Sequence, residues 1–226
     1  MTRLIFWDVD TLHDFMKSDG KLYVTGSEEI IPAVKALTDF AHANRIPIVA
    51  SADKHELSDP EISDTPDWKA TFPPHCMRGT PGQRKIEETQ LRNPLVIEPE
   101  RQDPGALAQQ VLAHQGDFLL NKRAVDVFTN ANVPALLSAL EPQAIVLYGV
   151  ATDFCNRYAV EGLFRVLPQV ELYVVSDAVR AIVPEEGEQL MAAWTERGIQ
   201  MITVQQIVGE GALDRHLSSR PVAPAH

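Results

Sequence analysis

Short hydrophobic segments alternate along the chain with stretches whose apolar residues recur at helical spacing. Short apolar runs rich in β-branched residues are typical of strands buried on both faces of a parallel sheet, whereas apolar positions three or four residues apart indicate amphipathic helices. The predicted strands are 4–9, 46–50, 117–120, 144–148, 170–175 and 200–204. The predicted helices are 27–44, 106–114, 132–140, 185–197 and one that begins at Phe154, with a short helix at 83–89 and a short extended piece at 94–98.

This alternation predicts an α/β fold. Parallel neighbouring strands need crossover connections, which are right-handed in nearly all known cases. Six strands with intervening helices therefore predict a three-layer α/β/α arrangement around a six-stranded, doubly wound parallel sheet of Rossmann-like type. We expect one domain over residues 1–217 and a flexible C-terminal tail over 218–226, where the composition is polar and rich in proline.

The composition narrows the range of molecules that the protein is expected to bind. The 226 residues are 45% hydrophobic and 23% charged, which suffices for one large core, and the formal net charge is −11. This acidic balance argues against nucleic-acid binding and favours a small neutral or cationic ligand. With two cysteines, no secretory segment and no apolar run long enough to span a bilayer, we expect a cytoplasmic protein that does not enter membranes.

Several chemically active side chains follow the predicted strands directly. Ligands of parallel sheets bind beyond the carboxyl ends of the strands, so residues at these positions converge on one edge. Side-chain alternation also places Asp8 and Asp10 on the same side of the first strand. The residues that follow the first four strands are Asp10, then Asp53 and His55, then Lys122, and finally Cys155.

The segment 144–164 contains the candidate nucleophile, Cys155. Gly149 is the first residue that can break the strand, and Thr152 or Asp153 can cap the following helix. Cys155 then lies in the first helical turn, where the helix dipole favours a thiolate. The alternative is that Cys155 is a small buried hydrophobic residue, as single cysteines often are.

A long irregular segment, 59–80, is rich in Pro, Asp, Ser and Thr but also carries Trp68, Phe72 and His75. It is too apolar for a linker and too irregular for a helix. We expect it to fold over a site, and we interpret Cys76 as a structural thiol.

Five stretches together resemble the isochorismatase-like cysteine hydrolases and, among them, the nicotinamidases. They are VDTLHDF (9–15), SADKH (51–55), FPPHCMRGTPG (72–82), NKRAVDVF (121–128) and GVATDFC (149–155). The resemblance implies a catalytic triad of Cys155, Asp10 and Lys122. It also implies a cis peptide bond between Val150 and Ala151, with the backbone N–H groups of Ala151 and Cys155 as oxyanion donors.

In such a triad Asp10 would accept the thiol proton and Lys122 would hold the resulting charge. Asp8 is an alternative base, although the resemblance favours Asp10. A Cys-His hydrolase with His13 or His75 as the base is the competing mechanism. The family often has Gln where this chain has Leu12, so a hydrogen bond near the catalytic aspartate is missing from the sequence pattern.

Asp53, His55 and His75 have the ligand types of a divalent metal site, with zinc as the expected ion. A second histidine that the family often has would fall near Glu61, with Asp64 close by, so the fourth ligand would be a carboxylate or water. The resemblance implies that nicotinamidases use such an ion to hold the ring nitrogen of the substrate. It further implies that Phe15 and Trp68 are aromatic walls of the substrate pocket.

These observations predict a cysteine-dependent amidohydrolase that cleaves a small, nicotinamide-like carboxamide to the acid and ammonia through a thioester, without an organic cofactor. The alternatives are an isochorismatase-type hydrolase of a vinyl ether and a noncatalytic member of the same fold. The family also suggests a homo-oligomer.

Overall fold

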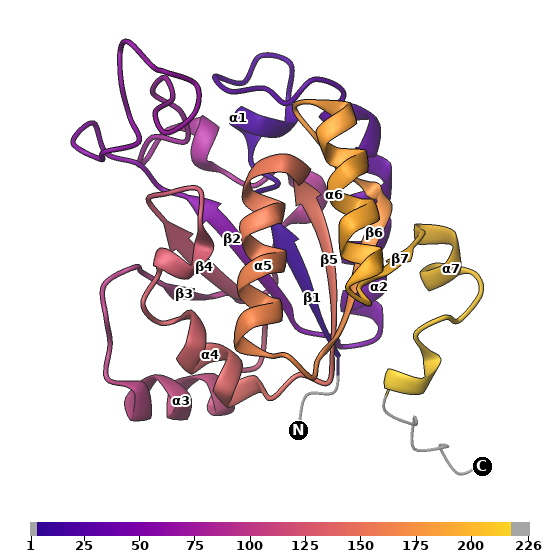
Figure 1. The fold of residues 1–226 in the computed structure, drawn as a ribbon. Helices are drawn as coiled ribbons and strands as arrows, with labels where there is room; N and C mark the ends of the chain where they lie inside the picture. The colour runs from indigo at the N-terminus through magenta and orange to yellow at the C-terminus, as the bar shows by residue number, and fades with distance from the viewer. Residues whose placement is uncertain (1–3, 218–226) are drawn as a thin grey trace, which may run out of the picture.

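A seven-stranded, fully parallel sheet forms the centre of the molecule in a computed structural model, which describes residues 4–217 (Figure 1). The strand order is β3-β4-β2-β1-β5-β6-β7. The strands are β1 (Leu4–Val9), β2 (Ile48–Asp53), β3 (Leu95–Ile97), β4 (Phe118–Lys122), β5 (Ala144–Val150), β6 (Glu171–Arg180) and β7 (Gln200–Ile202). The predicted α/β class and parallel sheet are confirmed, and the predicted tail 218–226 lies outside the described residues.

Helices cover both faces of the sheet. Along β1, Ile5 and Trp7 face a core shared with α3, α4, α5 and α6, whereas Leu4 and Phe6 face the core shared with α2. This alternation of apolar side chains on both faces is why β1 is a continuous hydrophobic run in the sequence. The helices are α1 (His13–Met16), α2 (Ile31–Ala43), α3 (Pro104–Ala113), α4 (Val133–Leu140), α5 (Arg157–Val166), α6 (Pro184–Glu196) and α7 (Val204–Val208).

The strand count is the main difference from the predicted sheet. The extended piece expected at 94–98 is strand β3, which pairs with β4 at the edge of the sheet and makes the total seven instead of six. The last predicted strand ends early, because Thr203 forms a capping box that begins α7.

Two predicted helices also differ in detail. The stretch 83–89 forms two short 3-10 turns, Pro81–Gln83 and Glu87–Thr89, because an extended segment between them makes a bridge from Lys85 to Leu12. The helix expected at 27–44 begins with a 3-10 turn, and the Ser27 hydroxyl donates to the carbonyl of Phe15 instead of capping α2.

The strand order brings the carboxyl ends of β4, β2, β1 and β5 side by side. Gly149 permits the close pairing of β5 with β1, since it has φ 115° and a Cβ there would lie 2.0 Å from the carbonyl oxygen of Val9. The segment 59–80 crosses this edge, as predicted, and places Phe72 and His75 against it.

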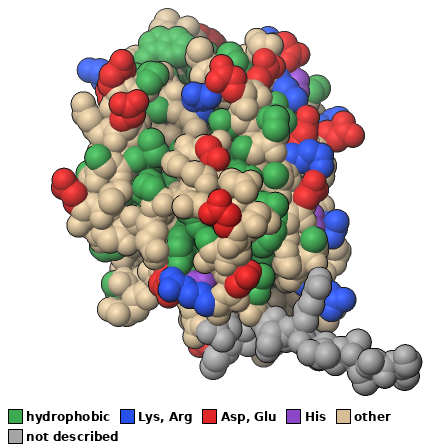
Figure 2. Space-filling model, turned by 90° about the vertical axis from the view of Figure 1, so that its right-hand side faces the viewer, with side chains coloured by type: hydrophobic (Ala, Val, Ile, Leu, Met, Phe, Trp, Pro, Cys, Tyr) green, Lys and Arg blue, Asp and Glu red, His purple; other side chains and the backbone are tan. Residues whose placement is uncertain are grey.

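One face of the surface, on the right of Figure 1, is shown in the space-filling view of Figure 2. Acidic and basic side chains are interspersed there, and no broad basic patch is visible on that face. None of the described helices is long and apolar enough to span a membrane.

Candidate active site

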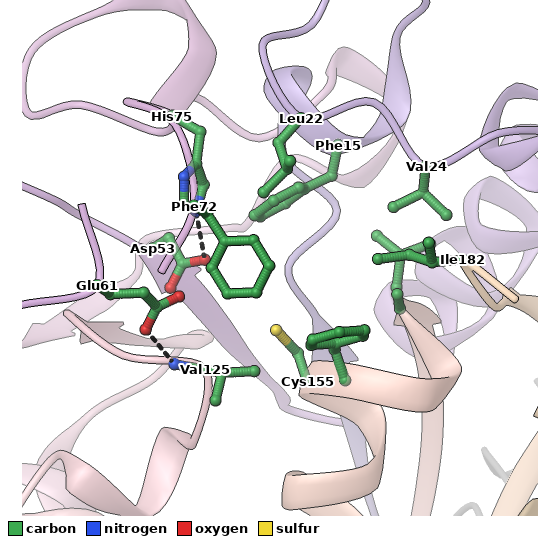
Figure 3. A pocket seen from close by; sticks show the side chains of 13 residues that line it. Phe15, Leu22, Val24, Asp53, Glu61, Phe72, His75, Val125, Cys155 and Ile182 are labelled. Atoms are coloured by element: carbon green, nitrogen blue, oxygen red, sulfur yellow. Dashed lines mark hydrogen bonds and ion pairs between the residues drawn. The ribbon is translucent and has the colours of Figure 1, made fainter. Parts of the chain in front are cut away.

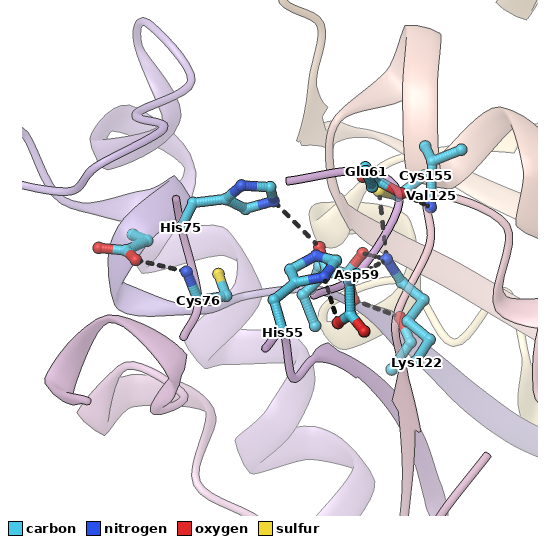
Figure 4. Close-up of polar contacts among 12 residues, drawn as sticks. His55, Asp59, Glu61, His75, Cys76, Lys122, Val125 and Cys155 are labelled. Atoms are coloured by element: carbon cyan, nitrogen blue, oxygen red, sulfur yellow. Dashed lines mark hydrogen bonds and ion pairs between the residues drawn. The ribbon is translucent and has the colours of Figure 1, made fainter. Parts of the chain in front are cut away.

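Three buried side chains meet where β1, β4 and β5 end. The Nζ atom of Lys122, at the end of β4, lies 3.1 Å from Asp10 Oδ2 and 3.6 Å from Cys155 Sγ. A second carboxylate oxygen, Oδ1 of Asp53, lies 2.5 Å from the same Nζ. The structure therefore brings together the three residues predicted for the triad, and two of them, Lys122 and Cys155, are labelled in Figure 4.

Asp10 and Asp8 have different partners although strand alternation predicted the same side for both. Asp10 has φ 48°, which ends the extended backbone of β1 and turns its carboxylate toward Lys122. The carboxylate of Asp8 instead accepts hydrogen bonds from Thr11 (2.9 Å) and Lys85 (2.8 Å). The structure thus assigns Asp8 to a different polar cluster, and the prediction of Asp10 over Asp8 agrees with this geometry.

Burial and mutual contact shift the proton affinities of the three groups. Burial raises the pKa of Asp10 above its ordinary value, against the opposing effect of Lys122. Burial alone would lower the pKa of Lys122, but the carboxylates of Asp10 and Asp53 raise it well above its usual range. Burial also raises the pKa of Cys155 well above its usual range, against the opposing effect of Lys122, which favours the protonated thiol over the thiolate expected from the helix dipole.

Cys155 lies in a π-helical turn, Thr152–Asn156, that precedes α5. Neither Thr152 nor Asp153 caps this turn, contrary to the prediction. The carboxylate of Asp153 instead accepts the backbone N–H groups of Ile182 (2.9 Å) and Val183 (2.8 Å), which ties the turn to the start of α6. The peptide bond between Val150 and Ala151 is cis, as the family resemblance implied.

A second buried cluster contains the predicted metal ligands. Ligand atoms of Asp53, His55 and His75 all lie within 4.8 Å of one another. The Nε2 atoms of the two histidines lie 3.7 Å and 3.8 Å from the oxygens of Asp53. Burial alone would raise the pKa of Asp53, but Lys122 and His55 hold it well below its usual range, so this carboxylate is charged.

The outer contacts of both histidines leave Nε2 facing the cluster. Nδ1 of His75 donates to the carbonyl of Pro73 at 2.8 Å, and Nδ1 of His55 lies 3.3 Å from Asp59 Oδ2. Nε2 of His55 is buried and has no hydrogen-bond partner among the described residues. Burial lowers the pKa of His75, which favours the neutral ring that binds metals. This orphaned nitrogen and the oriented donors fit a divalent metal ion.

Glu61 lies beside the metal cluster but outside its three-residue core. Its Oε2 accepts the backbone N–H of Val125 at 2.8 Å, which directs the carboxylate along the pocket wall. Burial raises the pKa of Glu61, with a further contribution from Asp53. Asp64, the other carboxylate near this position, is exposed.

A pocket that opens to solvent lies over Cys155 (Figure 3). Segments from five regions of the chain form its wall. The lining residues are Phe15, Leu22, Val24, Asp53, Glu61, Phe72, His75, Val125, Val150, Ala151, Phe154, Cys155 and Ile182.

The aromatic walls are only partly those predicted. Phe15 lines the pocket, but Trp68 does not and is 60% exposed. The Asp67 carboxylate accepts the N–H groups of Lys69, Ala70 and Thr71, and this tight turn holds Trp68 at φ 60° in solvent. Phe72 and Phe154, which pack edge to face with centroids 5.7 Å apart, take the place of Trp68.

Two positioning contacts could not be assigned from the sequence. Ser51 Oγ donates to Asp10 Oδ1 at 2.7 Å, and so supplies a hydrogen bond to this carboxylate where Leu12 cannot. Leu12 is fully buried in the apolar core instead. Asp14 accepts the backbone N–H of Cys76 at 2.7 Å and anchors the segment that carries His75. Ser51 and Asp14 both lie in the stretches that resemble the family, and this was the sequence signal that could have pointed to them.

The alternative bases are less well placed. His13 is not among the residues that line the pocket, and its Nε2 pairs with Asp19 at 3.3 Å. His75 lines the pocket, but its Nε2 faces Asp53. Cys76 is buried outside the lining, as expected for a structural thiol.

Comparison with known proteins gives the family. Residues 2–206 match the isochorismatase domain. The chain belongs to the isochorismatase family. The nicotinamidase/pyrazinamidase of Mycobacterium tuberculosis is 36% identical over 78 residues, which are 33% of this chain and 39% of that protein. The match therefore spans well under half the length of that relative.

Two solved structures share the fold of this family member. The pyrazinamidase of Pyrococcus horikoshii, in complex with zinc, is 22% identical with a TM-score of 0.69, over 89% of this chain and 99% of that one. The N-carbamoylsarcosine amidase of Thermoplasma acidophilum is 23% identical with a TM-score of 0.66, over 92% and 99%. At such identities the likeness is evidence for the fold alone.

Proposed function

We propose that the protein is a cysteine-dependent amidohydrolase that converts a small, nicotinamide-like carboxamide to the acid and ammonia. The observation that carries this proposal is the contact of Lys122 with both Asp10 and Cys155 at the floor of a pocket. The partial match to a nicotinamidase/pyrazinamidase supports the substrate class.

The reaction follows from the proton affinities of the site. Asp10 accepts the thiol proton as Sγ of Cys155 bonds to the amide carbon, and Lys122 balances the negative charge. The raised pKa of Asp10 makes it a stronger base than an ordinary aspartate. The protonated Asp10 then gives its proton to the departing nitrogen as the C–N bond breaks, and ammonia leaves.

Water completes the cycle. It attacks the thioester carbon with Asp10 as base, the C–S bond breaks, and the acid and the free thiol result. In each step the carbonyl oxygen becomes an oxyanion. We assign its stabilisation to the backbone N–H groups of Ala151 and Cys155, which belong to the turn at the pocket floor.

Asp53, His55 and His75 would hold a zinc ion, and water or Glu61 would complete the ligand set. Such an ion supplies a Lewis-acidic point that binds a lone pair of the substrate and orients its amide. The Pyrococcus horikoshii pyrazinamidase of the same fold is in complex with zinc, so zinc is the ion to test first. Metal analysis after dialysis should find about one equivalent in the wild type and in His13→Ala, and a loss in His55→Ala. Equal metal content in all three proteins would contradict the assignment.

Ammonia release from nicotinamide and other small carboxamides tests the function. We expect release by the wild type, none above background by Cys155→Ala, and nearly unchanged release by Cys76→Ala, the matched variant of the other buried thiol. Absence of release from every amide, or normal release by Cys155→Ala, would refute the proposal. The cytoplasmic location and the homo-oligomer stay predictions.

A further inference from the structure

The pocket has two chemically different ends with Cys155 between them. Figure 3 shows Asp53, Glu61 and His75 to the left of the thiol and Val24 and Ile182 to its right, with Leu22 above it beside Phe15. The first end carries the carboxylates and the candidate metal ligands. The second end is entirely apolar, so a substrate held at the thiol meets different chemistry on its two sides.

The apolar end is held in place by hydrogen bonds. The backbone N–H of Leu22 donates to the carbonyl of Asp14 (3.1 Å), and that of Val24 donates to the carbonyl of Phe15 (3.0 Å). The N–H of Ile182 donates to the Asp153 carboxylate, in the turn that carries Cys155. This wall is therefore preformed relative to the thiol, which is the condition for selecting substrates by shape.

The apolar end offers no cation to a charged substrate, since none of the described residues that line the pocket is Lys or Arg. Lys122, beneath the thiol, already contacts Asp10 and Asp53. Arg180, two residues before Ile182, pairs with Glu29 at 2.6 Å and does not line the pocket. A carboxylate placed at this end would give up part of its hydration to the apolar walls without gaining a cationic partner, which is costly.

We infer that the substrate is an uncharged carboxamide that carries a hydrophobic group, with the amide at Cys155 and the hydrophobic group against Leu22, Val24 and Ile182. This inference rests on the proposed amide hydrolysis and specifies its substrate class. Ile182 is a specificity-determining residue in this arrangement, because it lines the pocket and is also 44% exposed at its mouth.

Ring-substituted nicotinamides test this inference directly. In nicotinamide, position 5 mirrors the ring nitrogen across the axis of the amide group. With the ring nitrogen toward the metal ligands, a group at position 5 therefore points to the apolar end. We expect 5-propylnicotinamide to be hydrolysed with a kcat/KM at least about tenfold above the value for nicotinamide, and 5-carboxynicotinamide with one at least about tenfold below it.

Two lysine variants provide the matched comparison. Ile182→Lys places a cation at the apolar end, whereas Val183→Lys adds the same charge at the adjacent residue, which is 40% exposed and does not line the pocket. We expect Ile182→Lys to raise kcat/KM about three- to fivefold for the carboxy compound and to lower it for the propyl compound. We expect Val183→Lys to change neither value.

The outcomes separate the two proposals. If nicotinamide is hydrolysed but the carboxy compound is as good a substrate as the propyl compound, only the inference on the substrate class is overturned. Equal effects of the two lysine variants would overturn it as well, because the response would then reflect general charge. If none of the three amides is hydrolysed, the inference on the substrate class fails, and the proposed amide hydrolysis fails as well only if no other small carboxamide releases ammonia.

Discussion

Two buried aspartate–lysine pairs lie at the end of β1, and only one of them lies at the pocket. Asp10 and Lys122 are 3.1 Å apart beneath the pocket, and Asp8 and Lys85 are 2.8 Å apart in a separate cluster with Thr11. Both carboxylates are fully buried. Burial and pairing are thus common to both pairs, and what distinguishes the first is a thiol and a second carboxylate on the same lysine.

The two pairs differ in how completely the carboxylate oxygens are hydrogen-bonded. Asp8 is satisfied by Lys85 and by the Thr11 hydroxyl, and it joins β1 to the segment of Lys85. Oδ2 of Asp10 lies 3.1 Å from Lys122 but has no hydrogen-bond partner among the described residues. One oxygen therefore remains able to accept a proton from the thiol.

Replacing the lysine of each pair should give the largest difference in activity between the two pairs. Lys122→Met leaves Asp10 and Asp53 facing each other without a cation, so we expect activity to fall at least about 10³-fold and stability to fall by about 3–5 kcal/mol. Lys85→Met should cost a similar amount of stability and leave most of the activity. Urea unfolding and ammonia release measure both effects, and equal loss of activity in the two variants would remove the distinction.

Substitution of Asp10 should affect activity alone, whereas substitution of Asp8 should mainly affect stability. Asp10→Asn removes the base with little change in shape, and we expect kcat/KM to fall about 10²- to 10³-fold. Asp8→Asn should lower the free energy of unfolding and change kcat/KM less than about threefold. Near-normal turnover by Asp10→Asn would contradict the assigned triad.

The pH dependence of activity should report the raised pKa of Asp10. If Asp10 is the base, as we propose, activity should be present above its pKa and be lost as the pH falls through it, about tenfold per pH unit. The acid limb of kcat/KM should therefore lie above the ordinary aspartate range near 3.9. It should not move in Asp8→Asn. An acid limb at or below the ordinary value would contradict this prediction.

The smallest expected difference in activity is between variants that lack one of two hydroxyl groups. Ser51 donates to Asp10 (2.7 Å) and Thr11 donates to Asp8 (2.9 Å). Ser51→Ala should lower kcat about two- to tenfold, since one hydrogen bond that orients the base is lost, with little change in KM. Thr11→Val should leave kcat unchanged. A larger loss of activity in Thr11→Val than in Ser51→Ala would reverse the roles of the two clusters.

The sequence predicted the convergence of Asp10, Lys122 and Cys155 because strand ends of a parallel sheet meet at one edge whatever the loops do. No comparable rule predicts the conformation of a loop from its sequence. The turn built on Asp67 places Trp68 in solvent, and Phe72 takes the wall position, which periodicity cannot foresee. The partners of Ser51 and Asp8 come from segments distant in the chain, so they too required the fold.

The central claim is that Cys155 forms a covalent acyl intermediate. Mass spectrometry of the peptide containing Cys155, after rapid acid quenching during nicotinamide turnover, tests it most directly. We predict a nicotinoyl group on Cys155 and none on Cys76. Steady ammonia release with Cys155 free of an acyl group at every quench time, or with the acyl group on another side chain, would contradict it.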